Sequence, residues 1–269
     1  MKVVLFCGGL GTRIREYPES VPKPMIPVGH QPILWHLMNY YSQYCHTDFV
    51  LCTGYKANVI KDFFLSYRPQ TYADCIVSGF GTKVEVLGAQ GQDWRVALID
   101  TGVWRNIGER LLAVREHLQG EEIFLANYSD GLSDVDLDDM IARFRASDRL
   151  GCFLAVRPPL SFHFAELGGD GAVRGFRTSD RSDLWINGGF FLFRQGIFDF
   201  IKPGEELVQE PFTRLIEADA LMAYRHEGFW RAMDTLKDRQ VLEDMVEQGR
   251  MPWRRGETTP APSLSLAAQ

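Results

Sequence analysis

The chain has 269 residues, which at about 150 residues per domain corresponds to about 1.8 domains: one large domain, or a domain with an appendage. Hydrophobic residues make up 45% and charged residues 24%, so general disorder and a fibrous repeat are both excluded. The formal net charge is −6, and a nucleic acid is not an expected partner because its binding normally requires a basic face. Small phosphorylated ligands remain compatible with this charge.

The sequence predicts a cytoplasmic protein without a membrane segment. The apolar run that ends at Cys7 is shorter than a signal peptide requires, and no stretch of about 18 uninterrupted apolar residues occurs. The five cysteines are scattered and are never spaced as C-x-x-C. We therefore expect neither zinc nor a disulfide framework, and we expect mostly buried, reduced thiols.

Expected strands and helices alternate over the first 130 residues. Strands are predicted at 2–7, 48–53, 96–99 and 123–127, and helices at 32–45, 56–66 and 108–118. This order predicts a doubly wound, mostly parallel, Rossmann-like α/β sheet flanked by helices, with 2–7 as a central strand. Ligands bind beyond the carboxyl ends of such strands, so we expect the key loops to follow residues 7, 53 and 127.

Past residue 150 the pattern changes to shorter extended segments followed by helices. Extended segments are expected at 151–157, 172–177 and 185–194, and helices at 208–218 and 236–248. They predict mixed strands that finish the sheet and a helical C-terminal closure. No linker marks a boundary, so residues 1–253 are expected to form a single domain, followed by a flexible tail at 254–269.

A glycine-rich loop follows the first expected strand. It reads Gly8-Gly9-Leu10-Gly11-Thr12-Arg13. Glycines let backbone N–H groups approach an anion, while Thr12 and Arg13 add a hydroxyl and a guanidinium suited to phosphate oxygens. The loop is neither a P-loop, which needs Lys-Ser/Thr, nor a dinucleotide fingerprint, because position 14 is Ile14. A tight turn without a ligand is the alternative.

Ten residues after Arg13, Lys23 stands between Pro22 and Pro24. The prolines restrict the backbone, so the lysine is presented from a rigid segment, as a point charge for phosphate would be. A solvated loop lysine is the alternative, and the proximity of the glycine loop favours phosphate binding.

Together these motifs resemble the signature of sugar-phosphate nucleotidyltransferases. The likeness covers about residues 1–253 and includes Tyr128-Ser129-Asp130-Gly131, Ile186-Asn187-Gly188-Gly189, Gly228-Phe229-Trp230 and Met233-Asp234-Thr235. The C-terminal motifs are most similar to those of glucose-1-phosphate cytidylyltransferases. The resemblance implies that a nucleoside triphosphate, CTP first, condenses with a sugar 1-phosphate, glucose 1-phosphate or a relative, and releases pyrophosphate. It also implies a homo-oligomer, although the apolar positions would equally fill a monomer.

The resemblance divides the chain into a nucleotide-binding part, about 1–150, and an acceptor-binding and closure part, about 151–253. It assigns nucleotide binding to Gly8, Gly9, Gly11, Thr12, Arg13, Lys23 and Arg110, and catalysis to Arg13 and Lys23. It assigns Mg²⁺ to Asp130 and Asp234, a suitable pair because Mg²⁺ prefers one or two carboxylates with phosphates and waters. Taken singly, each aspartate would be an ordinary cap or turn residue. Asn187 and Gly188 are assigned to the acceptor.

The acceptor half departs from the family pattern. Members usually carry Glu-Lys-Pro before the Asn-Gly-Gly strand, and its lysine contacts the sugar phosphate; here the stretch contains neither lysine nor proline. Arg177 or Arg181 would restore the cation, since a guanidinium grips phosphate bidentately. Glu109 also adds charge near the expected base pocket. Two alternatives stay open: a non-standard phosphorylated or phosphonate acceptor, and a nucleotide-binding regulatory homologue without transferase activity.

Two further groups are expected outside the chemistry: an acidic cluster as a structural feature, and His163 and His226 as structural or binding residues. The acidic cluster at 134–139 precedes an apolar periodic segment, and we interpret it as the first turn of a helix rather than a second metal site. His163 and His226 have no sequence-local orienting partner, and an acceptor phosphate needs no strong base.

Overall fold

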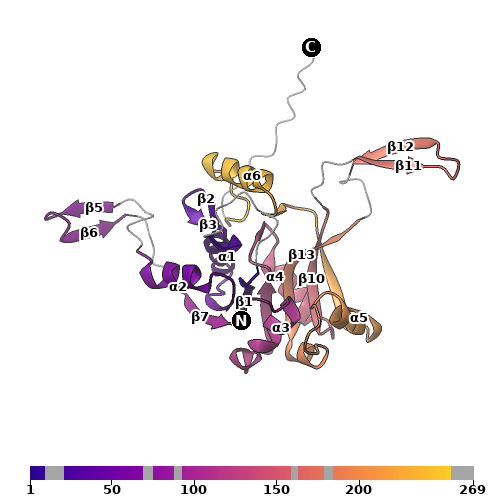
Figure 1. Ribbon diagram of the computed structural model, residues 1–269, viewed down its shortest axis with the longest axis horizontal. Coiled ribbons are helices and arrows are strands. Elements are labelled where there is room, and N and C mark those ends of the chain that lie inside the picture. Colours follow the sequence, from indigo (N-terminus) through magenta and orange to yellow (C-terminus); the bar gives the residue numbers. More distant parts are fainter. Residues whose placement is uncertain (10–20, 69–74, 88–92, 159–162, 179–183, 256–269) are drawn as a thin grey trace, which may run out of the picture.

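The computed structural model describes residues 1–9, 21–68, 75–87, 93–158, 163–178 and 184–255. Its centre is a seven-stranded sheet with the strand order β14-β10-β13-β8-β1-β4-β7 (Figure 1). The strands of this sheet are β1 (Val3–Phe6), β4 (Asp48–Thr53), β7 (Arg95–Asp100), β8 (Ile123–Asn127), β10 (Gly151–Val156), β13 (Ile186–Arg194) and β14 (Leu221–His226). The predicted α/β class is confirmed.

The first half of the chain supplies the parallel part of this sheet. β1 pairs in parallel with β8 on one side and β4 on the other, and β4 pairs in parallel with β7. Every residue of β1 is buried, as expected of a parallel strand covered on both faces, so its predicted central position is confirmed. The helices of this half are α1 (Ile33–Ser42), α2 (Ala57–Ser66) and α3 (Ile107–Ala113).

The second half adds the mixed strands that were predicted. β13 is antiparallel to both β8 and β10, whereas β14 is parallel to β10. Because β13 runs against its neighbours, its first residues lie at the carboxyl ends of β8 and β10. This reversal brings the Asn187 segment to the edge of the sheet where ligands of such folds bind.

Three helices complete the closure: α4 (Leu137–Arg145), α5 (Glu210–Glu217) and α6 (Leu236–Glu247). The acidic cluster does form the start of α4, since the carboxylate of Asp136 caps the helix by accepting from the backbone N–H of Asp139 (3.2 Å). α6 begins with a capping box between Thr235 and Asp238. The described residues also form the short 3-10 helices η1 (Lys23–Met25), η3 (Arg115–Leu118) and η5 (Gln195–Asp199).

Four two-stranded ribbons lie outside the main sheet. They are β2–β3 (Pro27–Val28 and Gln31–Pro32), β5–β6 (Cys75–Ser78 and Lys83–Val86), β9–β15 (Gly131–Ser133 and Trp230–Ala232) and β11–β12 (His163–Leu167 and Val173–Thr178). Of their strands, only β12 was expected from the sequence. The hairpins β5–β6 and β11–β12 project from the body on opposite sides (Figure 1). Of the predicted tail at 254–269, the structure describes only Arg254 and Arg255.

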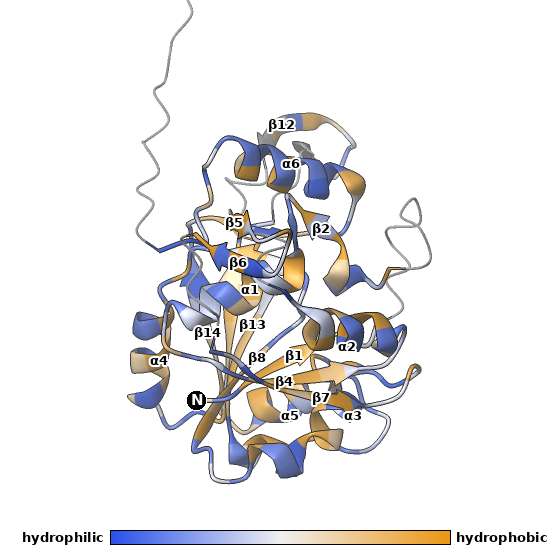
Figure 2. Cartoon of the chain, turned by 90° about the vertical axis from the view of Figure 1, so that its left-hand side faces the viewer, coloured by the Kyte–Doolittle hydropathy of each residue, from blue (hydrophilic) through white to orange (hydrophobic). Residues whose placement is uncertain are grey.

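The core lies on both faces of the sheet, whose strands are predominantly apolar (Figure 2). Side chains of β1 alternate between the two faces. Val3 and Leu5 join a cluster that contains residues of α1 and α4, and Val4 and Phe6 join a second cluster that contains residues of α3 and α5. As expected, most thiols are inside: Cys7, Cys52 and Cys152 are buried. Among the described residues, no helix is long and apolar enough to cross a membrane.

Candidate active site

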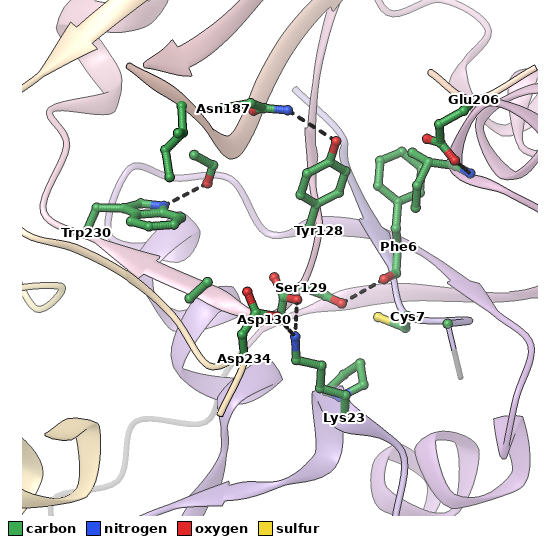
Figure 3. A pocket seen from close by; sticks show the side chains of 16 residues that line it. Phe6, Cys7, Lys23, Tyr128, Ser129, Asp130, Asn187, Glu206, Trp230 and Asp234 are labelled. Atoms are coloured by element: carbon green, nitrogen blue, oxygen red, sulfur yellow. Dashed lines mark hydrogen bonds and ion pairs between the residues drawn. The ribbon is translucent and has the colours of Figure 1, made fainter. Parts of the chain in front are cut away.

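A cavity of about 530 Å³ opens where β1 and β8 end (Figure 3). Its described lining comes from the end of β1 and the segments after β1 and β8, from η1, from the first residue of α3, from the first residues of β13, and from β15 with Asp234 after it. Glu206, before α5, completes it. The loops after residues 7 and 127 therefore lie where the fold class predicted them. The described part of the loop after Thr53 does not line the cavity; instead Tyr55 N–H donates to the Gly8 carbonyl (3.2 Å) and supports the glycine turn from behind.

Lys23, Asp130 and Asp234 converge in this cavity. The Lys23 Nζ donates to Oδ2 of Asp130 and to Oδ1 of Asp234, each at 2.7 Å (Figure 3). The two aspartates meet because the β9–β15 ribbon begins directly after Asp130 and ends two residues before Asp234. A backbone bond from Met233 N–H to the Asp130 carbonyl (2.8 Å) extends that pairing. The ribbon thus builds a two-carboxylate site from distant segments.

The ammonium of Lys23 and the carboxylates of Asp130 and Asp234 stabilise one another's charged forms. Burial lowers the pKa of Lys23, but the carboxylates of Asp130 and Asp234 raise it by more, so its net shift is upward and the amine is a cation. Its side chain is only 13% exposed. Because both carboxylates turn toward the same ammonium, the pair suits a small hard cation.

The donor set at this point fits Mg²⁺. Among the described residues, no group of three or more His, Cys, Asp or Glu side chains is placed to hold a metal. A divalent ion held by Asp130 and Asp234 would therefore complete its shell with phosphate oxygens and water, which is the coordination that Mg²⁺ favours.

The glycine loop is described only at its start. Gly8 and Gly9 are placed, whereas Gly11, Thr12 and Arg13 lie outside the described residues. Among the described residues, no atom lies within 4 Å of the position that a Cβ on Gly9 would take, and Gly9 lines the cavity. The backbone there is open to a ligand, as a phosphate-binding turn requires.

Arg110 braces this turn from inside the protein. Its side chain is buried, and it donates from Nη1 to the Thr101 hydroxyl (2.7 Å) and the Gly102 carbonyl (2.8 Å) and from Nη2 to the Gly8 carbonyl (2.9 Å). Arg110 is not among the residues that line the cavity. The structure thus gives this arginine a supporting position, and its direct contact with a nucleotide stays a prediction.

Glu109 has a structural role that the sequence analysis did not identify. Its carboxylate accepts from Asn106 N–H (3.1 Å), and the Asn106 side chain accepts from Glu109 N–H (2.9 Å). This is a capping box at the start of α3. The charge predicted to lie near the base pocket is therefore engaged in starting a helix.

The other end of the cavity is built around Asn187. Its Oδ1 accepts from Gly189 N–H (2.9 Å) and its Nδ2 donates to the Tyr128 hydroxyl (3.2 Å), while Trp230 Nε1 donates to the Gly188 carbonyl (2.8 Å). Gly189 has φ +76°, and a Cβ there would lie 2.7 Å from the Tyr128 ring, so the turn requires glycine. Asn187 and Gly188, predicted from the sequence, both line the cavity.

Tyr128, Trp230 and Glu206 also line the cavity, although the sequence analysis assigned them no role. Tyr128 and Trp230 belong to motifs on which the family resemblance depends, so the sequence could have marked both as site residues. It could not show their hydrogen-bond partners. Burial raises the pKa of Tyr128, which keeps its phenol neutral. Glu206 accepts from Leu207 N–H (3.0 Å), and nothing in the sequence marks it.

The two arginines expected to restore the missing lysine come from β12 and from the segment that follows it. Arg177 belongs to β12, in a hairpin that projects from the body, and Arg181 lies outside the described residues. Their assignment to the acceptor stays a prediction.

The surroundings of His226 and Cys7 agree with the expectation that neither residue takes part in the chemistry. His226 Nε2 lies 2.8 Å from Asp134 Oδ1 and 3.2 Å from the Phe229 carbonyl, so this ring joins β14 to the segment before α4. His163 begins β11. Burial raises the pKa of the Cys7 thiol to about 12, so Cys7 stays neutral and is no nucleophile.

Fold and site define an α/β protein with an open glycine turn, a converging lysine and carboxylate pair, and a polar recess at the far end. The model of the nucleotidyl transferase family matches residues 2–238, and the chain belongs to that family. It is 38% identical over 259 residues to the glucose-1-phosphate cytidylyltransferase of Salmonella typhimurium, covering 96% of this chain and 100% of that protein. It is 34% identical over 256 residues to the probable glucose-1-phosphate cytidylyltransferase of Bacillus subtilis, covering 94% and 99%.

Solved structures show the same fold at lower identity. UTP-bound UGPase from Acinetobacter baumannii matches with a TM-score of 0.66 and 17% identity, over 93% of this chain and 95% of that one. HddC from Yersinia pseudotuberculosis, complexed with GMP-PN, matches with a TM-score of 0.63 and 16% identity, over 91% and 99%. At these identities the likeness concerns the fold alone.

Proposed function

We propose that the protein transfers a cytidylyl group from CTP to glucose 1-phosphate or a related sugar 1-phosphate, producing a CDP-sugar and pyrophosphate. The observation that carries this proposal is the arrangement of one cavity, with Lys23, Asp130 and Asp234 at one end and Asn187, Tyr128 and Trp230 at the other. The nucleotide and the acceptor follow the relatives, which bear the name glucose-1-phosphate cytidylyltransferase.

In this reaction a phosphate oxygen of the acceptor attacks the α-phosphorus of CTP. The bond from that phosphorus to the oxygen leading to the β-phosphate breaks, and pyrophosphate leaves with the electron pair. A phosphomonoester already carries an anionic oxygen near neutral pH, because its second pKa is about 6. No general base is required, in accord with the engagement of His226 by Asp134 and the neutral thiol of Cys7. The protein accelerates the step by alignment and charge neutralisation.

The residues divide this work between the two ends of the cavity. Mg²⁺, when held by Asp130 and Asp234, would neutralise phosphate charge and bring the reacting groups together. Lys23, freed from the carboxylates, would hold the triphosphate together with Arg13 and stabilise the departing pyrophosphate. Gly8 and Gly9 would offer backbone N–H groups to the phosphates. Asn187 and the neighbouring Gly188 would orient the sugar hydroxyls.

The experiment that tests the proposal measures pyrophosphate release from CTP, UTP, dTTP, ATP and GTP with Mg²⁺, each with and without glucose 1-phosphate. We expect release with CTP that depends on glucose 1-phosphate and that Lys23→Ala abolishes. No release from any nucleotide, while CTP still binds, would contradict the proposal. It would indicate a different phosphorylated acceptor or a binding protein that has lost the transfer reaction.

Two properties of the whole protein belong to the same proposal. We place the enzyme in the cytoplasm, where nucleoside triphosphates and sugar phosphates are made.

We also infer that copies of the chain associate, because the β5–β6 hairpin exposes Ile76 (53%), Val77 (59%) and Phe80 (fully) to solvent. A two-stranded hairpin is marginally stable alone, and an apolar surface on such an arm is normally covered by another chain. A second copy is the partner that is always available.

A further inference from the structure

Two arginines contact one indole beside the acceptor end of the cavity. The guanidinium carbon of Arg157 lies 4.9 Å from the centre of the Trp185 ring, and that of Arg225 lies 5.5 Å from it. These are cation–π distances, and each contact holds a planar cation in place. Three strands meet here, since Arg157 follows β10, Trp185 precedes β13 and Arg225 belongs to β14.

The sheet register places this cluster in line with Asn187. Ala155 of β10 pairs with Asn187 on one side and with Arg225 on the other, so these three residues form one row across the strands. Arg157 lies two residues after Ala155, and Trp185 lies two residues before Asn187. Side chains of one row point to the same face, so Arg225 shares the face on which Asn187 reaches Tyr128, and its contact with Trp185 brings the cluster to that face.

The cluster adjoins the end of the cavity remote from the carboxylates, and none of its three residues belongs to the described lining. Ile186 and Asn187, which follow Trp185 directly, line the cavity, while Lys23, Asp130 and Asp234 lie on the other side of Tyr128 (Figure 3). An acceptor whose reacting phosphate lies near Lys23 would therefore turn its far end toward Arg157 and Arg225.

We infer that Arg157 and Arg225, held on Trp185, form a subsite for a second anionic group on the acceptor, at the end opposite its reacting phosphate. This inference rests on the proposed nucleotidyl transfer and specifies its substrate class: a sugar 1-phosphate that also carries a carboxylate or a phosphate. Guanidinium groups suit both, since their parallel N–H donors match two oxygens of either group. Glu227, 3.8 Å from Arg157 and largely exposed, would be exchanged for that anion.

The test compares three acceptors with CTP and Mg²⁺: glucose 1-phosphate, glucuronic acid 1-phosphate and glucose 1,6-bisphosphate. We expect at least one of the doubly anionic acceptors to have a kcat/KM about tenfold above that of glucose 1-phosphate, the effect of one charged hydrogen-bonded pair. The carboxylate and phosphate probes show which anion the subsite takes. In Arg157→Gln and Arg225→Gln the ratio of kcat/KM between the doubly anionic acceptor and glucose 1-phosphate should fall toward one. The change should come from a higher KM for the doubly anionic acceptor.

Arg115→Gln is the matched control, because Arg115 also lies over an aromatic ring, that of Phe198 (5.1 Å), but in η3, before β8 begins. It should keep the preference. Equal kcat/KM for all three acceptors in the wild type would overturn the inference. So would an unchanged preference for the doubly anionic acceptors in both Arg157→Gln and Arg225→Gln.

A binding measurement tests the anion subsite independently of the proposed reaction. Titration calorimetry with glucose 1,6-bisphosphate, on protein saturated with a CTP analogue that carries a methylene between its α- and β-phosphorus atoms, requires no turnover. If no acceptor reacts, the proposed function fails, while tight binding lost in Arg157→Gln still supports the subsite. Turnover of glucose 1-phosphate without any gain from a second anion leaves the function standing and rejects the subsite.

Discussion

The Nζ of Lys23 lies 2.7 Å from Oδ2 of Asp130, across 107 residues of sequence. The same ammonium reaches Asp234 at 2.7 Å, so one side chain holds together both carboxylates that would bind the metal. A residue assigned to the triphosphate and a pair assigned to Mg²⁺ are thus in direct contact before any substrate binds. Substrate binding has to exchange these partners, and the first two predictions follow from this exchange.

Asp130→Asn should leave a folded protein and lower kcat by about a hundredfold or more, because the metal would lose a charged ligand and the phosphates would lose alignment. Initial rates of pyrophosphate release, with thermal unfolding as the test of folding, measure this. Asp148→Asn, at an exposed position before β10, is the control and should behave as wild type. Near wild-type rates at saturating Mg²⁺ would remove Asp130 from the mechanism.

Lys23→Met should abolish turnover yet strengthen the binding of a divalent ion in the absence of nucleotide. The ammonium competes with the ion for the two carboxylates, and its removal takes away a cation that offsets their mutual repulsion. Electron paramagnetic resonance of Mn²⁺ measures the free ion directly, and we expect its Kd to fall about tenfold. Weaker or unchanged Mn²⁺ binding in Lys23→Met would show that the lysine does not occupy the metal position.

Arg110→Met should destabilise the protein. The buried guanidinium donates hydrogen bonds to oxygens of Gly8, Thr101 and Gly102, and its loss leaves these oxygens without that donor. Each unsatisfied buried group costs about 1–3 kcal/mol, so we expect the free energy of unfolding to fall by about 3 kcal/mol in urea titrations. Arg115→Met, with its exposed side chain, provides the comparison. A variant of unchanged stability that no longer binds CTP would instead make Arg110 a direct nucleotide ligand.

Much of the fold follows from local patterns. The buried run of β1 and the helical spacing in α1 predicted the parallel half of the sheet and the loops at its carboxyl edge. The pairing of β9 with β15, by contrast, joins segments about a hundred residues apart, and it is this pairing that brings Asp130 and Asp234 together. The resemblance to a family named both aspartates, but nothing local in the sequence shows that they meet.

Other features depended wholly on tertiary contacts. The hairpin β5–β6 was missed because its strands are largely exposed and show no alternation of apolar and polar burial. Arg110 was expected in the nucleotide site because the family resemblance assigns it there. Its burial is stabilised by the carbonyls of Gly8 and Gly102, which only the folded chain brings together. Side chains satisfied by distant backbone groups leave no signal in the sequence.

The inferred self-association rests on the β5–β6 hairpin, and Phe80→Asn should weaken it. Phe80 has φ +55°, a conformation that asparagine tolerates better than phenylalanine, so the substitution removes apolar surface without straining the turn. Light scattering should give the wild type a multiple of 30.6 kDa and the variant a smaller mass at equal concentration. Ile216→Gln, which changes an exposed side chain of α5, is the control. A monomeric wild type at working concentration would refute the association.

The protein should lose stability as the pH falls from about 6.5 toward 4. Burial lowers the pKa of both His36 and His46 to about 4, whereas the ordinary value is 6.5. Between these values the unfolded chain binds protons that the folded chain excludes, so this stability is present above pH 6.5 and is lost as the pH falls through 4. A shift of this size corresponds to about 3 kcal/mol for each histidine at most.

His46→Phe isolates one of these contributions. Among the described residues neither ring nitrogen of His46 has a hydrogen-bond partner, so phenylalanine fills the site without breaking a bond. Urea unfolding at pH 7 and pH 4.5 should show a smaller loss of stability for this variant than for the wild type. His30→Gln, at an exposed position, should keep the wild-type loss. An equal loss in His46→Phe and the wild type would show that His46 is not held neutral in the folded protein.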